Sequence, residues 1–365
     1  MYIYFDYQNE RGDDLNIPEL KIGPLVARIP VIQGGMGIGV SGPLLAAAVA
    51  NEGGIGIISG VQLGYNEPDF NRNSLEANRR ALRRAIAKAR ELSPTGIIGV
   101  NFMVAANHYK EMVQTAVEEK IDLIISGAGL PLDLPTFAKD SDTCLVPIVS
   151  SAKAAKLLIR RWARQDRQPD ALVVEGPLAG GHLGFKREDI DKPESSLDQL
   201  IRDVLDTVRS LDLSIPVIGA GGIRTGSDIG RILSLGASGV QMGTSFVTTV
   251  ECDAPDTYKQ AYLDARPEDM LVLQSPVGLP GRALVTPFTR RITEEGRLKV
   301  QKCWDCLQTC NPATTPYCIS QALIDAVTGK EGLIFSGSPV CADTRLVTVR
   351  ERIGQLMEEL RSYHP

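Results

Sequence analysis

Several residue types and patterns are scarce in this 365-residue chain, and their scarcity excludes whole classes of function. Aromatic residues make up only 5% of it, and histidine occurs three times. No apolar run approaches the roughly 20 residues that a membrane-spanning helix needs, and the N-terminus lacks the basic and then apolar order of a signal peptide. A net charge of −5 argues against a surface dedicated to nucleic acid. We therefore expect a cytoplasmic protein with no membrane or nucleic-acid partner.

Glycine, by contrast, is abundant, with 35 residues, and eight short apolar runs recur along the first 250 residues. The runs are continuous rather than alternating, as expected for strands buried on both faces of a parallel sheet. They span residues 29–33, 56–59, 97–101, 123–126, 145–149, 171–175, 216–219 and 239–242. Amphipathic helical patterns separate them, so the sequence predicts an α/β fold, a (β/α)8 TIM barrel. A doubly wound sheet is the main alternative.

Beyond residue 250 the alternation stops. We therefore place the barrel in residues 1–250 and a C-terminal appendage, packed against the barrel and touching its rim, in residues 251–365. The appendage contains the motif Ser275-Pro-Val-Gly-Leu-Pro-Gly-Arg-Ala283, a cysteine-rich stretch and a charged terminal helix. The long polar segment 186–198 is either a lid over the site or a solvated loop.

The residues that directly follow the strands of a (β/α)8 barrel form its active site. Two glycine turns, 219–222 and 243–244, follow strands seven and eight, where such barrels commonly bind a phosphate. Backbone N–H groups there, with the N-terminus of a helix capped by Thr225 or Ser227, favour a dianion. No dinucleotide-binding Gly-x-Gly-x-x-Gly unit is present, so a mononucleotide is the simpler ligand.

The other rim residues suit a flat ring. Gln33 and Asn101 carry amides that can hydrogen-bond to its edge, and glycines after the first and sixth strands let the backbone lie close to it. The sixth strand runs into Ala179-Gly-Gly-His182, and a histidine beside such a surface can exchange protons near neutral pH. A surface role is the favoured interpretation for His108, although it could face the rim, and His364 is expected to be uninvolved.

Seven cysteines in a chain without an export signal indicate a reducing compartment. Four of them form the pattern Cys303-x2-Cys306-x3-Cys310-x7-Cys318, whose spacing a metal ion or an iron–sulfur cluster could use. Packing of thiols within a compact appendage is the favoured alternative, and we therefore predict no metal site from the sequence.

Six motifs in residues 25–250 resemble the nitronate monooxygenase (2-nitropropane dioxygenase) family, and flavin-dependent enoyl-ACP reductases share them. They are Pro30-Val-Ile-Gln33-Gly-Gly-Met36, Gly99-Val-Asn101, Ser126-Gly-Ala-Gly129, Glu175-Gly-x2-Ala179-Gly-Gly-His182-Leu-Gly184, Ile215-Pro-Val-Ile-Gly-Ala-Gly-Gly222 and Gln241-Met-Gly-Thr244-Ser-Phe246. The resemblance implies FMN bound non-covalently in a TIM barrel, with its phosphate at the two glycine turns. It also implies that His182 is the catalytic residue.

The implied activity is oxidation of alkyl nitronates with O2 by an FMN-dependent oxidoreductase. The alternative is an enoyl-ACP (enoyl-thioester) reductase that uses NAD(P)H, because Gln33-Gly-Gly-Met36 and Glu175 match the reductase pattern. A non-catalytic flavin-binding protein is a third alternative, and a homodimer is the default assembly. The predicted cofactor-binding residues are Gln33, Gly34, Gly35, Met36, Asn101, Glu175, Gly180, Gly181, Gly219, Gly221, Gly222, Gln241, Gly243 and Thr244.

Overall fold

A computed structural model describes residues 17–337 and 344–364 of the chain. Eight parallel strands form a closed barrel in which each strand pairs with the next along the chain, and the last pairs with the first. The barrel strands are β3 (Val31–Gln33), β4 (Ile55–Ser59), β5 (Ile97–Met103), β6 (Leu123–Gly127), β7 (Cys144–Val149), β8 (Leu172–Glu175), β10 (Val217–Ala220) and β11 (Gly239–Met242). Each corresponds to one of the eight predicted runs, so the prediction of a (β/α)8 barrel is confirmed.

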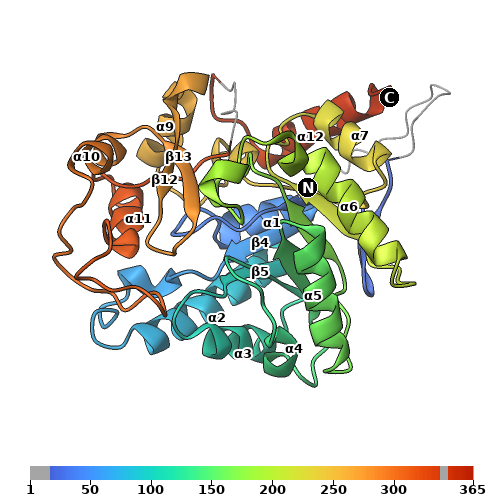
Figure 1. Cartoon of the computed structure of the whole chain (residues 1–365), viewed down its shortest axis with the longest axis horizontal. Coiled ribbons are helices and arrows are strands. Elements are labelled where there is room, and N and C mark those ends of the chain that lie inside the picture. Colours follow the sequence, from blue (N-terminus) through green and yellow to red (C-terminus); the bar gives the residue numbers. More distant parts are fainter. Residues whose placement is uncertain (1–16, 338–343, 365) are drawn as a thin grey trace, which may run out of the picture.

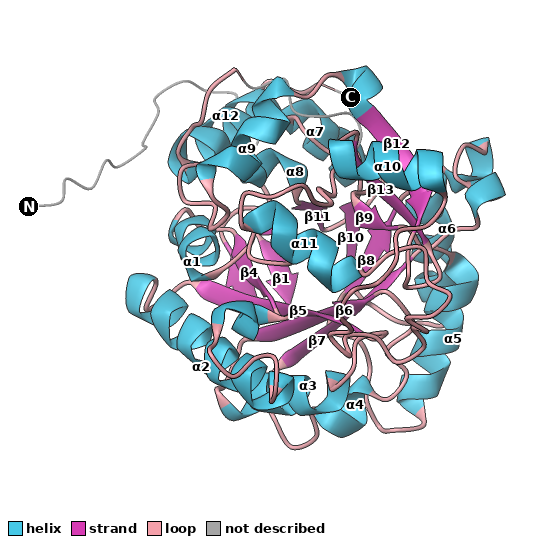
Figure 2. Ribbon diagram, turned by 90° about the vertical axis from the view of Figure 1, so that its left-hand side faces the viewer, coloured by secondary structure: helices cyan, strands magenta, loops and turns pink. Residues whose placement is uncertain are grey.

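Helices surround this barrel, as the end-on view shows (Figure 2). Those that follow the barrel strands are α1 (Pro43–Asn51), α2 (Ser74–Leu92), α3 (Tyr109–Glu118), α4 (Leu134–Phe137), α5 (Ala152–Ala163), α6 (Leu197–Arg209), α7 (Gly226–Ser234) and α8 (Thr244–Val247). Short 3₁₀ turns occur at η1 (Leu63–Asn66), η2 (Arg187–Asp189), η3 (Pro193–Ser195) and η4 (Pro267–Asp269). No helix in the described ranges combines the length and the apolarity needed to cross a bilayer.

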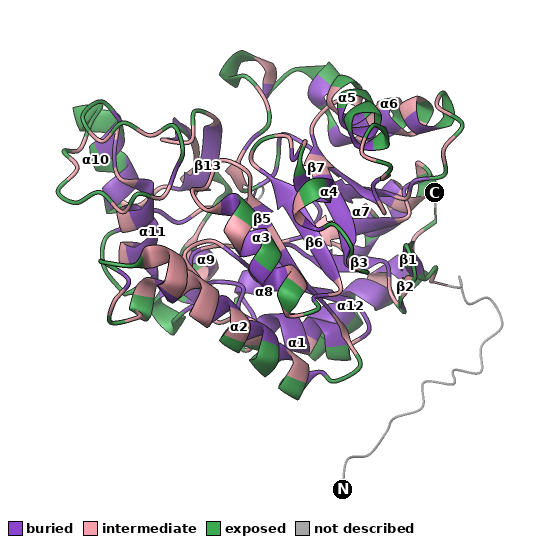
Figure 3. Ribbon diagram, turned by 90° about the horizontal axis from the view of Figure 1, so that it is seen from below, coloured by how far each residue is buried: buried purple, intermediate pink, exposed green. Residues whose placement is uncertain are grey.

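Alternate residues of the strands face two different apolar layers. Side chains such as Ile32, Ile57 and Val173 fill the barrel interior, whereas Val31 and Val174 pack outward against the helices. Most residues of the strands are accordingly buried (Figure 3). A hairpin of β1 (Leu20–Ile22) and β2 (Leu25–Ala27) packs against the interior cluster. This burial on both faces explains why the strands read as continuous apolar runs.

The chain after residue 250 makes two kinds of contact with the barrel. Its elements are α9 (Asp256–Asp264), β12 (Met270–Gln274), β13 (Pro280–Leu284), α10 (Pro287–Glu295), α11 (Ile319–Val327) and α12 (Val349–Arg361). Strands β12 and β13 form a sheet with β9 (Gly181–His182), which follows β8. We call residues 270–337 the cover, because α11 lies across the barrel in the end-on view and Leu323 of α11 lines the cavity at the strand ends (Figure 2).

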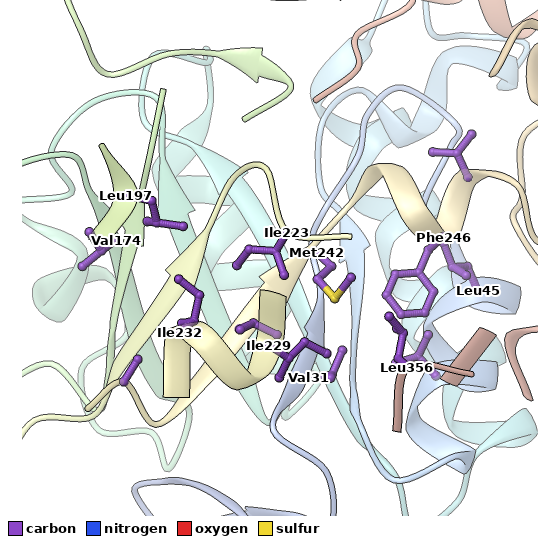
Figure 4. Packing of buried hydrophobic residues seen from close by; sticks show 14 of the residues in the cluster. Val31, Leu45, Val174, Leu197, Ile223, Ile229, Ile232, Met242, Phe246 and Leu356 are labelled. Carbon is purple, nitrogen blue, oxygen red and sulfur yellow. The ribbon is translucent and has the colours of Figure 1, made fainter. Parts of the chain in front are cut away.

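Helix α12, by contrast, packs against the barrel's outer layer beside α7, and Figure 1 shows these two helices next to each other. Leu356 of α12 joins the same apolar cluster as Phe246 and Leu45 (Figure 4). The two helices approach closely because Gly226 has no side chain: a Cβ there would lie 2.2 Å from the Leu356 carbonyl oxygen. The division of the chain into two domains at residue 250 stays a prediction.

Candidate active site

A cavity of about 230 Å³ opens at the carboxyl ends of the barrel strands. All of the predicted site residues line it except Gln33 and Gly219. The predicted residues that it brings together are Gly34, Gly35, Met36, Asn101, Glu175, Gly180, Gly181, His182, Gly221, Gly222, Gln241, Gly243 and Thr244. They come from the ends of five different strands and from β9, which is the arrangement that (β/α)8 barrels use for active sites.

Gln33 and Gly219 lie behind the cavity wall instead of lining it. The Gln33 side chain is fully buried, where its Nε2 donates to the Gly34 carbonyl at 2.5 Å and its Oε1 accepts from the Ile57 N–H at 3.1 Å. Gly219 faces the helical layer, and a Cβ there would lie 2.8 Å from Ile232 Cγ2. Both residues therefore support the wall from behind. The sequence predicts where the strands end, but it does not show which of the alternating residues points toward the cavity.

Missing side chains shape the cavity wall. A Cβ on Gly35 would lie 2.4 Å from the Asn101 Cβ, and one on Gly180 would lie 2.5 Å from the Gly337 backbone nitrogen. Gly221 and Gly222 have φ angles of +96° and +78°, which L-residues rarely adopt. These glycines therefore let the segments of the wall pack closely against one another, and they place no side chain in the cavity that they line.

One buried polar atom on this wall indicates a ligand. Among the described residues, the Gln241 Oε1 atom on β11 is buried and has no hydrogen-bond partner. Buried polar atoms are normally paired, since leaving one unpaired costs about 1–3 kcal/mol. A flat ligand with an N–H donor at its edge would supply the missing partner. Together with the glycine wall, this fits a flavin ring.

The predicted phosphate site needs a correction at the N-terminus of α7. Thr225 does cap this helix, as expected, but carboxylates already hold its first N–H groups. Asp228 accepts from the N–H groups of Arg224 and Thr225, each at 3.0 Å, and Glu359 of α12 accepts from that of Gly226 at 2.7 Å. The amides of Arg224, Thr225 and Gly226 are therefore already paired within the protein.

A positive side chain also lines the cavity near this turn. Arg224 directly follows Gly221-Gly222-Ile223 and lines the cavity. Guanidinium groups bind phosphate through several parallel N–H donors. Arg224 was not among the residues predicted from the sequence, although its position directly after the glycine turn is a usable signal.

His182 lies where the barrel and the cover meet. It pairs with Gly281 of β13, and its Nε2 lies 2.8 Å from the Ser275 Oγ. Its ring meets that of Phe335 edge to face, with centroids 5.1 Å apart. Burial lowers the pKa of His182 to about 4. The imidazole is therefore neutral at pH 7, and it can accept a proton or donate one hydrogen bond.

Glu175, at the end of β8, shows the opposite shift. Burial raises the pKa of its carboxyl group to about 8. In the ligand-free protein this side chain is therefore mostly protonated at neutral pH and can donate a hydrogen bond into the cavity. The site thus holds a neutral base and a neutral acid, a separation of pKa values that is typical of catalytic sites.

A second cavity of about 60 Å³ adjoins the first, and His182, Phe102 and Leu323 line both. Its remaining wall is largely apolar and includes Leu307 and Ile319 of the cover. His108, which is partly exposed, also lines it and so faces the rim, the less favoured of the two interpretations of this residue. None of residues 186–198 lines either cavity, which favours the solvated loop over the lid for this segment, whereas residues of the cover line both cavities.

The residues that sequence reasoning missed come mainly from the cover. Ser275 hydrogen-bonds to His182, and Phe335 packs against it; the sequence had indicated that the appendage touches the rim but not which of its residues do so. Thr244, which was predicted, accepts a hydrogen bond from the Gly337 N–H at 2.9 Å. Contacts across such long sequence separations leave no periodic signal.

Comparisons with known proteins agree with this geometry. The nitronate monooxygenase family model matches residues 19–359. One relative, from Rhodococcus jostii (strain RHA1), is 30% identical over 270 residues, and the match covers 74% of this chain and 66% of that protein. Its name is "(3aS,4S,5R,7aS)-5-hydroxy-7a-methyl-1-oxo-octahydro-1H-indene-4-carboxyl-CoA dehydrogenase". The chain thus spans about two thirds of that relative's length. A "probable nitronate monooxygenase" of Staphylococcus aureus (strain Newman) is 29% identical, with coverages of 73% and 78%.

Two solved structures are also similar. FabK from Thermotoga maritima superposes with a TM-score of 0.71 at 29% identity and covers 91% of this chain and 93% of its own. The nitroalkane oxidase from Streptomyces ansochromogenes gives a TM-score of 0.68 at 21% identity, with coverages of 93% and 97%. The second likeness is one of fold.

Proposed function

Because the chain belongs to the nitronate monooxygenase family, whose members are flavin-dependent oxidoreductases, we propose that it is an FMN-dependent nitronate monooxygenase that oxidises alkyl nitronates with O2. One observation carries the choice of cofactor: a glycine-walled cavity presents the unpaired Gln241 Oε1 atom. A bound flavin would supply the electron-accepting chemistry, which no amino-acid side chain provides.

Each part of FMN has a matching part of the cavity. The backbone at Gly34, Gly35 and Gly180 would lie against the ring, and Gln241 would accept a hydrogen bond from its edge. The glycine turn at 221–222, with the Arg224 side chain, would hold the phosphate. A single phosphate group suits this turn and matches the absence of a dinucleotide-binding unit.

The neutral imidazole of His182 suits the chemistry of nitro compounds. It can accept the acidic α-proton of a nitroalkane, or donate a hydrogen bond to the nitro oxygen of a nitronate. The Ser275 hydroxyl holds the His182 ring at 2.8 Å, and the Phe335 ring limits its movement. The protonated Glu175 carboxyl provides a further donor on the same wall.

The alternative function is reduction of an enoyl thioester by NAD(P)H, and two observations favour it. The likeness to FabK, an enoyl-ACP reductase, extends over 91% of the chain, and the Rhodococcus relative is named for a CoA thioester. The apolar cavity beside His182 would suit an acyl chain. In that reaction His182 would hydrogen-bond to the thioester oxygen or supply a proton.

Anaerobic mixing separates the two functions. The purified flavoprotein is mixed with propionate 3-nitronate, NADH or NADPH in separate experiments, and the flavin absorbance is followed. We expect the nitronate to change the flavin spectrum within turnover time. Rapid reduction by NADH or NADPH without any response to the nitronate would overturn the first function in favour of the second. A colourless protein that cannot be reconstituted with FMN would overturn both.

A further inference from the structure

Four cysteines surround a separate small cavity in the cover. Cys303, Cys306 and Cys310 lie on the loop between α10 and α11, and Cys318 is the N-cap residue of α11. All four line one cavity of about 30 Å³, and each is a free thiol. The rest of the wall is mostly apolar and includes Trp304.

The arrangement does not suit a single metal ion. Within residues 17–337 and 344–364, no group of three or more His, Cys, Asp or Glu side chains is close enough together to hold one ion. A tetrahedral zinc site needs each sulfur about 2.3 Å from a common centre. The four cysteines line a common cavity, and a polynuclear cluster accepts thiolates at its separate corners.

We propose that Cys303, Cys306, Cys310 and Cys318 bind an iron–sulfur cluster in this cavity. Simple packing of thiols accounts less well for the geometry, because packing cysteines would fill the space between them. The short spacings within residues 303–310, followed by a ligand from another element, are also typical of cluster-binding loops.

A hydrogen-bond donor is directed at one of these sulfurs. The Asp305 N–H donates to the Cys303 Sγ at 3.4 Å. Such donors stabilise the negative charge of thiolate ligands and tune the cluster potential. The N-terminal end of α11 adds favourable dipole charge next to Cys318.

The barrel holds this loop in place. The Asn107 N–H donates to the Cys306 carbonyl at 3.0 Å, and its side-chain Nδ2 donates to the Asp305 carbonyl at 2.8 Å. Gln308 Nε2 donates to the Val104 carbonyl at 3.1 Å. Because Cys306 also lines the second cavity beside His182, the cluster would lie directly behind the wall of the candidate active site.

Metal and sulfide analysis tests the proposal on the full chain. The protein is purified anaerobically, reconstituted with ferrous iron and sulfide, and assayed for iron, acid-labile sulfide, zinc and flavin. We expect iron and sulfide in equal amounts, about two to four of each per chain. One zinc per chain without sulfide would overturn the proposal, and so would the absence of iron after reconstitution.

Single substitutions identify the ligands. Cys303→Ser and Cys310→Ser should each lose most of the iron and sulfide while flavin content stays unchanged. Because Cys303 is exposed, its replacement by serine should not disturb folding, so loss of iron in this variant reports the loss of a ligand. Cys252→Ala, which changes a buried cysteine outside this cavity, is the matched control and should keep the cluster. Full iron and sulfide in Cys303→Ser would refute the assignment. Flavin content is measured separately, so loss of the cluster and failure of the flavin assignment are distinguishable.

Discussion

The barrel and the cover contribute to the candidate site in different ways. Each barrel strand pairs in parallel with the next one in sequence, and the ends of the strands supply glycines and amides for a cofactor. The cover instead contributes Ser275, which lies 93 residues after His182 in the sequence and hydrogen-bonds to it. The barrel therefore supplies most of the cavity wall, whereas the cover supplies the hydrogen-bond partner of His182.

The largest expected effect is at His182, where the two regions meet. His182→Asn should lower turnover by roughly 10²–10⁴, the usual effect of losing an acid–base group, while flavin content is retained. Steady-state turnover and flavin absorbance measure the two quantities. His364→Asn, an exposed histidine near the C-terminus, is the matched control and should change neither. Unchanged turnover in His182→Asn would show that the barrel and its cofactor suffice without this residue.

A second prediction isolates the barrel and concerns stability against pH. In the flavin-free protein, burial raises the pKa of Glu175 from 4.5 to about 8, so the folded state keeps a proton that the unfolded chain releases. Stability is therefore lost as the pH rises from 4.5 to 8. Glu175→Gln should raise the free energy of unfolding at pH 8 by roughly 1–3 kcal/mol and have little effect at pH 4.5.

His182 acts in the opposite direction in that experiment. Burial lowers its pKa from 6.5 to about 4, so its contribution to stability is lost as the pH falls through this range and is constant above it. The change between pH 6.5 and 8 thus isolates Glu175. Urea unfolding of the flavin-free protein measures it, with exposed Glu295→Gln as control. An equal pH slope in Glu175→Gln and the unaltered chain would contradict the shift.

The smallest expected effect isolates the cover. Ser275→Ala removes the hydrogen bond to His182, a loss of about 0.5–1.5 kcal/mol, so turnover should fall roughly 3- to 10-fold with flavin content unchanged. Ser275→Thr keeps the hydroxyl and should restore most of the turnover. If Ser275→Ala and Ser275→Thr behave alike, the hydroxyl does not position His182.

The same contrast explains what could be predicted from the sequence. The eight strands were predictable because burial on both faces leaves continuous apolar runs, and the rim glycines follow from strand order alone. The roles of Ser275 and Phe335 were not predictable, since their contacts with His182 depend on how β13 pairs with β9. Gln33 shows why prediction of single site residues is less accurate. A shift of one residue along the strand decides whether a side chain lines the cavity or, like Gln33, hydrogen-bonds to the neighbouring strand β4.

Helix α12 has a consequence for how the protein is made. Its residues, Val349–Arg361, pack beside α7 and α1, and Glu359 holds an amide of α7. On the ribosome the barrel strands emerge long before this helix, so the outer layer stays open at the α7–α1 seam while the cover is being synthesised. The apolar cluster that contains Leu45 and Phe246 lacks the packing of Leu356 until α12 has been synthesised. The outer helical layer is therefore completed at this seam only after α12 has been synthesised, which follows synthesis of the cover.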